Sequence, residues 1–187
     1  MKLSRVMTSR LVLILATLAA LSTEIGNGPK RAGANPDPDT SDNSSSEIKA
    51  RIENLIQSWF AILEDPTAEA NALLDLLAQA PFELLLDGKA IRDRRGLLEW
   101  LSNLRTTYSQ IEYRLDSVCI HPEGPGRYRV RFEFDRHALD ETGLPHAARR
   151  EHAWIVQDNA GGTPVILSIE ERPLLFFSGT GPQIICY

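Results

Sequence analysis

The chain has 187 residues, 43% of them hydrophobic and 24% charged, which is typical of a globular protein with one domain and short extensions. Its formal net charge is −5 and its pI is about 5.4, whereas nucleic-acid-binding proteins usually carry a basic face and a high pI. We therefore expect no nucleic-acid partner, and the scattered acidic residues indicate no acidic tail.

Residues 1–22 have the three parts of a bacterial-type signal peptide. Basic residues at positions 2, 5 and 10 precede an apolar run at 11–21, and the small side chains of Ala20 and Ser22 provide a cleavage site. The run is too short to span a bilayer, which takes about 20 residues. We expect an exported protein, periplasmic or secreted, with no membrane span after cleavage. The alternative is an uncleaved N-terminal anchor.

Residues 23–46 are predicted to form a disordered linker, because they are rich in Gly, Pro, Ser and Asp and almost free of apolar side chains. The folded domain is predicted to start at Glu47, which is spaced from Ser44 as in a capping box. Apolar residues at helical spacing then continue to Leu63 and predict a long first helix.

A second helix is predicted to begin at Asp65-Pro66, an N-cap followed by proline, to carry the leucines at 73–77 and to end before Pro81. The apolar run at 82–86 and the segment 89–91 flank an Asp-Gly turn signal and predict a small hairpin. Asp93 can cap a third helix, which holds Gly96 in its first turn.

The rest of the domain alternates between apolar and polar residues with period two, as strands do. The alternating segments are 111–120, 127–138, 146–157 and 164–171. The alternation slips near Ser117, which predicts a β-bulge there. In the last segment Val165, Leu167 and Ile169 are expected on one face. Helices followed by antiparallel strands indicate an α+β fold.

Three local features, in this order, resemble the nuclear transport factor 2-like superfamily, also called SnoaL-like. They are Trp59-Phe60-x-x-Leu63, Ile91 with Leu98 and Trp100, and residues 152–156 followed by a Gly-rich turn and Ile166 or Ile169. The resemblance covers residues 47 to about 173. It implies a cystatin-like cone, in which three N-terminal helices pack on a strongly bent antiparallel or mixed sheet around a pocket. The domain would span 47–177, followed by a tail at 178–187.

The superfamily contains isomerases, dehydratases, cyclases, epoxide hydrolases and non-catalytic binding modules, so the fold does not select a function. Its ketosteroid isomerases need a carboxylate base and two donors for the enolate oxygen. By the resemblance, the base falls near Leu84 to Leu86, and the two donors fall near Trp59 and His152. Because leucine cannot take a proton, we expect that this mechanism is not used.

His152 is the main catalytic candidate, together with Tyr113 or Tyr128, because an imidazole can act as a base near neutral pH. The alternative is a structural histidine, since no partner carboxylate is identifiable on its face. The candidate ligand-binding residues share the inner face of the predicted sheet or the helix stripes, although aromatic residues at such positions are also typical of a core. They are Trp59, Trp100, Tyr128, Phe132, His152 and Trp154.

The opposite sheet face carries alternating Arg and Glu or Asp residues from 127 to 135 and at 149–151. It is interpreted as a solvated surface, or as a docking surface, and its desolvation cost favours a monomer or weak dimer. Cys119 and Cys186 are a disulfide candidate in an exported protein, or two unpaired residues. No histidine or cysteine spacing indicates a metal, and no cofactor is implied.

Three functions remain open from the sequence. The first is non-catalytic binding of a small hydrophobic molecule in an aromatic-lined pocket. The second is a cofactor-independent lyase or isomerase that uses His152. The third is a protein-interaction module that uses the charged face or the C-terminal tail.

Overall fold

The computed structural model describes residues 40–79, 81–159 and 162–174, all within one compact unit. The predicted signal peptide, most of the predicted linker and the tail at 178–187 lie outside the described residues. None of the described helices is both long enough and apolar enough to cross a bilayer.

The first helix, α1, spans Thr40–Glu64 and therefore begins before the predicted domain start at Glu47. The prediction that the linker extends to residue 46 is thus wrong for residues 40–46. Once an apolar stripe has nucleated a helix, extension into neighbouring polar residues costs little. The stripe itself is as expected, because Ile52, Ile56 and Trp59 are fully buried.

The second helix, α2, is much shorter than predicted and spans only Asn71–Asp75. Asp65 does not cap it. The Asp65 carboxylate instead accepts a hydrogen bond from the Thr67 backbone N–H at 2.8 Å, which closes a local turn. Leu77 forms a parallel bridge with Ile166, so the end of the leucine run joins the sheet.

The predicted hairpin is confirmed as β1 (Glu83–Leu86) and β2 (Lys89–Ile91). Its two turn residues, Asp87 and Gly88, have φ angles of 48° and 74°, and positive φ at both positions is what a two-residue type I′ hairpin turn requires. The third helix, α3, spans Arg94–Thr107. The carboxylate of Asp93 caps it by accepting a hydrogen bond from the Gly96 N–H at 2.7 Å, as predicted.

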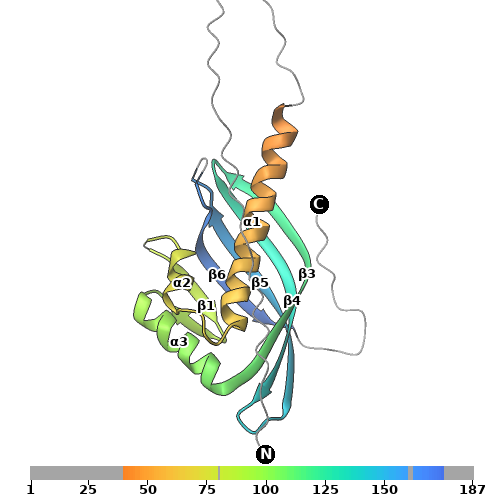
Figure 1. The fold of residues 1–187 in the computed structure, drawn as a ribbon. Coiled ribbons are helices and arrows are strands. Elements are labelled where there is room, and N and C mark those ends of the chain that lie inside the picture. Colours follow the sequence, from red (N-terminus) through yellow and green to blue (C-terminus); the bar gives the residue numbers. More distant parts are fainter. Residues whose placement is uncertain (1–39, 80, 160–161, 175–187) are drawn as a thin grey trace, which may run out of the picture. The chain divides into compact units, whose positions relative to one another are not determined.

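Four long strands complete the domain: β3 (Tyr108–Gly124), β4 (Arg127–Asp140), β5 (Pro145–Gln157) and β6 (Val165–Pro173). The sheet order is β2-β1-β6-β5-β4-β3 (Figure 1). The β1–β6 pair is parallel and the other pairs are antiparallel, so the six-stranded sheet is mixed. The α+β prediction is confirmed, although α3 follows the hairpin and the sheet holds more of the described chain than the helices do.

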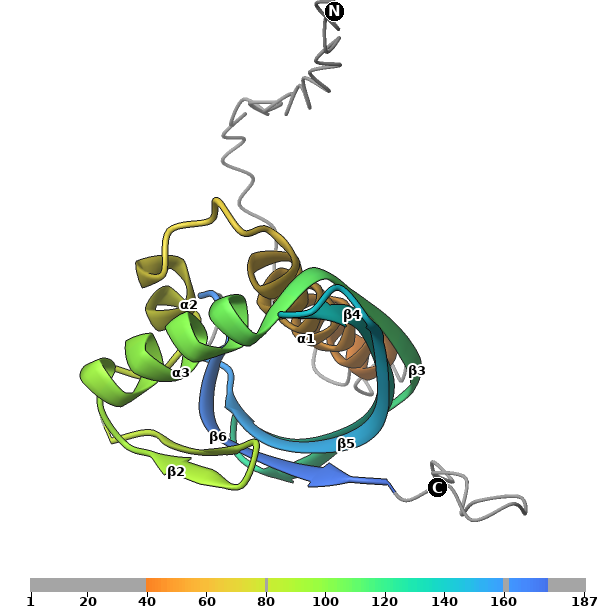
Figure 2. The same cartoon turned by 90° about the horizontal axis from the view of Figure 1, so that it is seen from below.

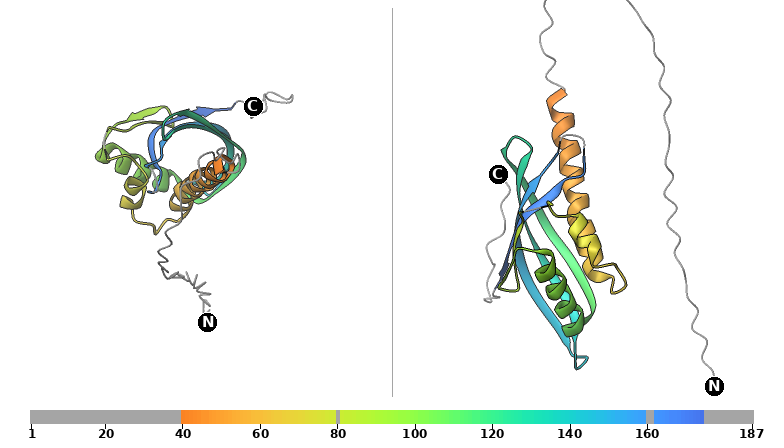
Figure 3. Two further views of the ribbon diagram at one scale, coloured as in Figure 1. Left: turned by 90° about the horizontal axis from the view of Figure 1, so that it is seen from above. Right: turned by 90° about the vertical axis from the view of Figure 1, so that its left-hand side faces the viewer.

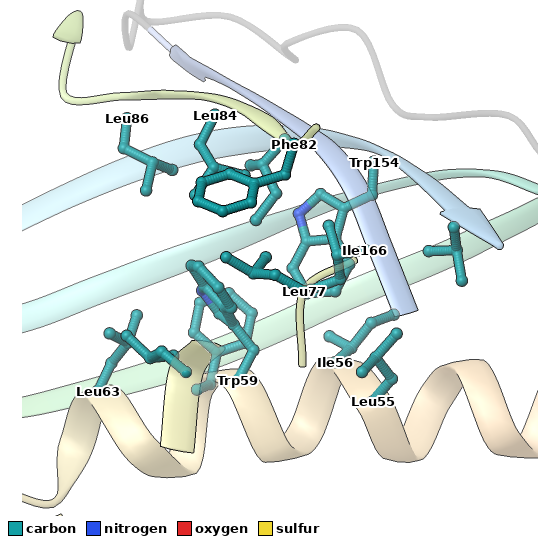
Figure 4. Packing of buried hydrophobic residues seen from close by; sticks show 14 of the residues in the cluster. Leu55, Ile56, Trp59, Leu63, Leu77, Phe82, Leu84, Leu86, Trp154 and Ile166 are labelled. Atoms are coloured by element: carbon teal, nitrogen blue, oxygen red, sulfur yellow. The ribbon is translucent and has the colours of Figure 1, made fainter. Parts of the chain in front are cut away.

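The long strands curve around one side of the unit, and α1 and α3 lie on the other side of the space that they enclose (Figure 2). Figure 3 shows α1 running along the length of the sheet, where it contacts β3. The core fills the space between these layers. In the close-up, Trp59 on α1 faces Trp154 and Ile166 of the sheet, with Leu84 beyond them (Figure 4).

Two bulges set which side chains face the core. A register shift between Leu115 and Val118 confirms the bulge predicted near Ser117. A second shift was not predicted: Ile155 pairs with Ser168, but Val156 pairs with Ile166, which leaves Leu167 extra on β6. Ile166 and Ile169 are therefore buried, and the expectation that Val165 and Leu167 share a face with Ile169 is wrong.

The outer face of the sheet carries paired charges, as the alternation predicts. The guanidinium of Arg149 contacts the carboxylates of Glu133 at 2.8 Å and Asp116 at 2.7 Å. Arg131 pairs with Glu151 across β4 and β5. Cross-strand pairs of this kind contribute roughly 0.2–1 kcal/mol each.

Candidate functional site

A small cavity of about 10 Å³ lies within the core, between α1, α3 and the inner face of the sheet. A volume of this size holds about one water molecule. The lining residues are Trp59, Phe60, Leu63, Leu86, Trp100, Tyr113, Phe134, Arg136, His152 and Glu171. The cavity therefore combines an aromatic and aliphatic wall with a compact group of charged and polar side chains.

His152 is 2% exposed, and both of its ring nitrogens make hydrogen bonds. Its Nε2 lies 3.1 Å from Oε2 of Glu171 on β6, and its Nδ1 lies 3.1 Å from the indole Nε1 of Trp154 on β5. An indole N–H can only donate, so Nδ1 of His152 must be the acceptor. The proton of the neutral imidazole is therefore on Nε2, where it is donated to Glu171.

Glu171 is the partner carboxylate of His152 that was not identified from the sequence. Besides His152, its oxygens accept a hydrogen bond from the backbone N–H of Asp87 at 3.1 Å and pair with Arg150. Arg150 in turn contacts Oδ1 of Asp87 at 2.9 Å. Glu171, Arg150 and Asp87 thus each contact the other two, and this group lies next to the imidazole of His152.

Asp87 is the first residue of the hairpin turn and has a positive φ. Its Oδ2 accepts a hydrogen bond from the indole Nε1 of Trp100 at 3.1 Å. Arg136 is 3% exposed and reaches Oδ1 of Asp87 only at 3.7 Å, while its guanidinium lies 4.8 Å from the centre of the Tyr108 ring. Arg136 is therefore the least well paired charge of the group.

Burial is the largest single influence on the pKa values of these side chains, although for one of them other effects together outweigh it. Burial lowers the pKa of His152 and outweighs the opposing effect of Glu171, so the imidazole is neutral at pH 7. Burial acts to raise the pKa of Glu171, but the hydrogen bond from His152 and the charge of Arg150 outweigh it and lower the pKa to about 2. Burial also raises the pKa of Tyr113, against the effect of Arg136, so this phenol stays protonated.

Two buried donors at the cavity have no hydrogen-bond partner among the residues that the structure describes. They are the indole Nε1 of Trp59, whose side chain is fully buried, and Nε of Arg136. A buried donor without an acceptor costs about 1–3 kcal/mol. The site therefore offers two donors to an acceptor that the described residues do not supply.

The structure brings together some of the predicted site residues and separates others. Trp59, Trp100, Tyr113 and His152 line the cavity. Phe132 and Trp154 do not line it; they pack around the imidazole, with ring centres 5.5 Å and 6.0 Å from that of His152.

Tyr128 lies further along the sheet. It pairs with Val156, four residues along β5 from His152, which is about 13 Å at the usual rise per residue. Tyr128 is therefore not placed to act with His152. Leu84 and Leu86 are buried core residues, and the carboxylate that follows them, Asp87, is already held by Trp100 and Arg150.

Four charged residues of the site were missed from the sequence: Asp87, Arg136, Arg150 and Glu171. A usable signal existed for three of them. Arg136 continues the alternation of Phe132 and Phe134, and Arg150 continues that of His152, so both were on inward positions. Glu171 continues the alternation of Ile169, which is expected and found on the inner face, so its inward position was also predictable.

The described ranges contain no group of three or more potential metal ligands. Cys119 on β3 is 2% exposed, and the described part of the chain contains no free thiol. Cys186 lies outside the described residues, so the pairing of the two cysteines stays a prediction.

No known family profile and no curated protein matches the sequence. Solved structures do match the fold. A nuclear transport factor 2-like superfamily protein from Salmonella enterica is 15% identical with a TM-score of 0.63, over 74% of this chain and 99% of its own. A protein with a cystatin-like fold from Caulobacter vibrioides is 14% identical with a TM-score of 0.57, over 69% and 91%.

A hexachlorocyclohexane dehydrochlorinase is also similar, at 12% identity and a TM-score of 0.60, over 76% of this chain and 99% of its own. At such low identities the likeness concerns the fold and not the chemistry. The bent mixed sheet and the covering helices match what the sequence resemblance implied, whereas the cavity is far smaller than the implied pocket. The described part of the chain has the nuclear transport factor 2-like, cystatin-like α+β fold.

Proposed function

We propose that the protein is an exported, non-catalytic binding domain whose interior takes a small hydrophobic molecule that carries one hydrogen-bond acceptor, such as a carbonyl or carboxylate oxygen. The observation that carries the proposal is the indole Nε1 of Trp59, which is fully buried at the cavity and has no partner among the described residues. Export rests on the signal-peptide pattern of residues 1–22.

The apolar character of the ligand follows from the wall of the cavity. Leu63, Leu86 and Phe134 line one part of it, and an apolar molecule would exchange water contacts for contacts with them. An acceptor oxygen would satisfy the Trp59 donor and would lie near the loosely paired guanidinium of Arg136. The two requirements together define a small amphipathic molecule with one polar end.

The cavity has to widen to admit such a ligand. Its volume of about 10 Å³ is far below the roughly 300–1,000 Å³ of ordinary ligand pockets. The described conformation therefore corresponds to a closed state, in which binding would displace side chains such as those of Trp59 and Trp100. This requirement keeps the expected ligand small and its affinity modest.

Catalysis by His152 is not favoured by this geometry. A general base needs a free lone pair within reach of the substrate, whereas the lone pair of Nδ1 already accepts from Trp154. The hexachlorocyclohexane dehydrochlorinase with the same fold is an enzyme, but a shared fold at 12% identity does not transfer its chemistry.

Matched pairs of small molecules test the proposal by thermal shift and native mass spectrometry. Cyclohexanone and benzoate supply an acceptor, while methylcyclohexane and toluene present similar apolar bodies without one. We expect the acceptor-bearing probes to raise Tm, by roughly 5–10 °C near 100 times Kd. The same probes should lose most of this effect with Trp59→Phe. Equal responses to both members of each pair, or none to either, would contradict the proposal.

A protein-interaction module is the second candidate, and the small size of the cavity favours it. A space for one water can be filled by that water, which would satisfy Trp59 without any ligand. This alternative predicts a high-resolution structure with an ordered water on Trp59 Nε1, and no probe that changes Tm.

A further inference from the structure

Cys119 lies on the outer face of the sheet, although it is buried. On β3, its neighbours Val118 and Ile120 pair with Phe132 and Val130, whose side chains are in the core, whereas Cys119 pairs with Arg131. Residues directly opposite each other in an antiparallel pair point to the same face. Cys119 therefore points outward with Arg131.

The burial of Cys119 is not explained by the described elements. Its side of the sheet carries Arg131, whose side chain is 47% exposed, and the helices lie on the inner side (Figure 2). Cys119 nevertheless has only 2% of its surface exposed, and the described part of the chain contains no free thiol. Something must cover this position and engage its sulfur.

We propose that Cys119 forms a disulfide with Cys186 and that this bond fastens residues 175–187 across the outer face of β3, β4 and β5. Cys186 is the only other cysteine in the sequence. The occupant of this face is thus a segment of the same chain. The proposal is independent of the ligand-binding function, which concerns the inner face.

The chain is long enough for this connection. The backbone N–H of Leu174 bonds to the carbonyl of Arg149 at 3.0 Å, which fixes where the C-terminal segment starts. Arg149 pairs with Asp135, four residues along β4 from Arg131, so Cys119 lies about 14 Å along the strands and about 14 Å across three strand spacings, or roughly 20 Å away. Twelve residues can reach about 40 Å.

The composition of the segment also fits a covering role. Phe176 and Phe177 stand at its start, and Ile184 and Ile185 precede Cys186, with polar and Gly-rich residues at 178–183 between them. An apolar segment gains by leaving water, and the aliphatic stems of arginines on the outer face offer a surface for it. The central polar residues give the chain the freedom to turn.

The bond forms by thiol–disulfide exchange with a disulfide-bearing oxidant of the export compartment. The two thiols of Cys119 and Cys186 lose two protons and two electrons as their S–S bond forms. The disulfide of the oxidant is cleaved and leaves as two thiols, so atoms and electrons balance. An oxidising compartment is what the signal-peptide pattern of residues 1–22 predicts.

Peptide mapping of the full-length chain, produced by secretion and alkylated without reduction, tests the bond directly. Trypsin releases Cys119 in 115–127 and Cys186 in 151–187, because the bond between Arg172 and Pro173 resists cleavage. We expect these two peptides to be linked in monomeric protein and to separate on reduction. Alkylated cysteine in the unreduced protein, or a linkage found only in a disulfide dimer, would overturn the proposal.

Variants test whether the bond fastens the segment. Cys186→Ser removes the bond without altering the buried position, and we expect it to lower Tm by about 5–15 °C. It should also speed chymotryptic cleavage after Phe177 at least tenfold relative to the oxidised wild type. Cys119→Ser with Cys186→Ser should behave like the single variant. Unchanged cleavage and Tm in Cys186→Ser would contradict a fastened segment.

Discussion

The indole Nε1 of Trp154 donates a hydrogen bond to Nδ1 of His152, two residues earlier on β5, at 3.1 Å. Alternate residues on a strand share a face, so the sequence spacing itself makes this contact possible. The contact occupies the only free lone pair of a neutral imidazole whose other nitrogen faces Glu171. Both ring nitrogens of His152 are therefore engaged within the cavity wall.

Replacing Glu171 by Gln should destabilise the protein strongly. The change leaves Arg150 with only Asp87 as a partner, and it forces an amide donor toward either Arg150 or His152. Breaking a buried pair of this kind costs about 3–5 kcal/mol. Urea unfolding at pH 7 measures the change in the free energy of unfolding.

Glu170→Gln is the matched control for this variant. Glu170 is the neighbouring residue on β6, and it pairs with Arg172 in an exposed position, where ion pairs contribute little. We expect it to leave the free energy of unfolding nearly unchanged. Similar behaviour of the two variants would show that the Glu171 cluster does not hold the core together.

Stability should decrease as the pH is lowered from 7. His152 in the unfolded chain protonates near pH 6.5, but burial lowers its pKa in the folded protein, so the unfolded state binds more protons below that pH. Glu171 acts in the same direction from about pH 5 downward, because its folded pKa of about 2 lies below the ordinary value. Each group can contribute a slope of at most about 1.4 kcal/mol per pH unit.

Urea titrations from pH 4 to 8 would reveal this dependence. His152→Gln should remove the loss that begins near pH 6.5, while Glu171→Gln should flatten the part below pH 5. A wild-type stability that is constant between pH 7 and pH 5 would be inconsistent with a buried neutral His152.

Two tryptophans offer a matched comparison of hydrogen bonding inside the core. Trp59 and Trp100 stack with ring centres 6.4 Å apart, but among the residues that the structure describes only Trp100 has a partner for its N–H, the carboxylate of Asp87. Replacement of either by Phe removes similar volume. Trp100→Phe should therefore cost about 1–2 kcal/mol more than Trp59→Phe, as measured by urea unfolding. Equal costs would indicate that Trp59 also has a bound acceptor in the purified protein.

Two adjacent leucines on β1 test which face of the sheet forms the core. Leu84 is fully buried, whereas Leu85 is 36% exposed on the other face. Leu84→Ala should lower the free energy of unfolding by about 2–5 kcal/mol. Leu85→Ala should change it by about 0.5 kcal/mol or less. The reverse order of the two effects would contradict the register of β1 against β6.

Features with strong local signals were predictable from the sequence. The Asp87-Gly88 turn, the Asp93 cap and the strands from 111 onward follow from turn chemistry, capping and alternation, and the structure confirms them. The helix predicted over the leucine run at 73–77 is confirmed only as far as Asp75. A short apolar run fits a helix or a strand, and Leu77 pairs with Ile166 of β6 instead.

The polar site could be predicted only in part. His152 and Trp154 were recognised by their shared face, but their partner Glu171 was not. Glu171 shares a face with Ile169, two residues earlier on β6, but its position opposite His152 is set by the pairing of β6 with β5, which cannot be read from the β6 sequence. Asp87 was assigned only to the turn, because its contact with Trp100 depends on how α3 packs against the hairpin.

The central claim is that hydrogen bonds hold both ring nitrogens of His152, so that this residue lines a binding site and does not act as a base. Nitrogen-15 NMR of histidine-labelled protein tests this claim most directly. Two-bond couplings identify which ring nitrogen carries the proton, and His152→Gln assigns the signal. The structure predicts a neutral ring protonated at Nε2, with chemical shifts that show no titration near pH 6.5. Protonation at Nδ1, or titration near pH 6.5, would contradict it.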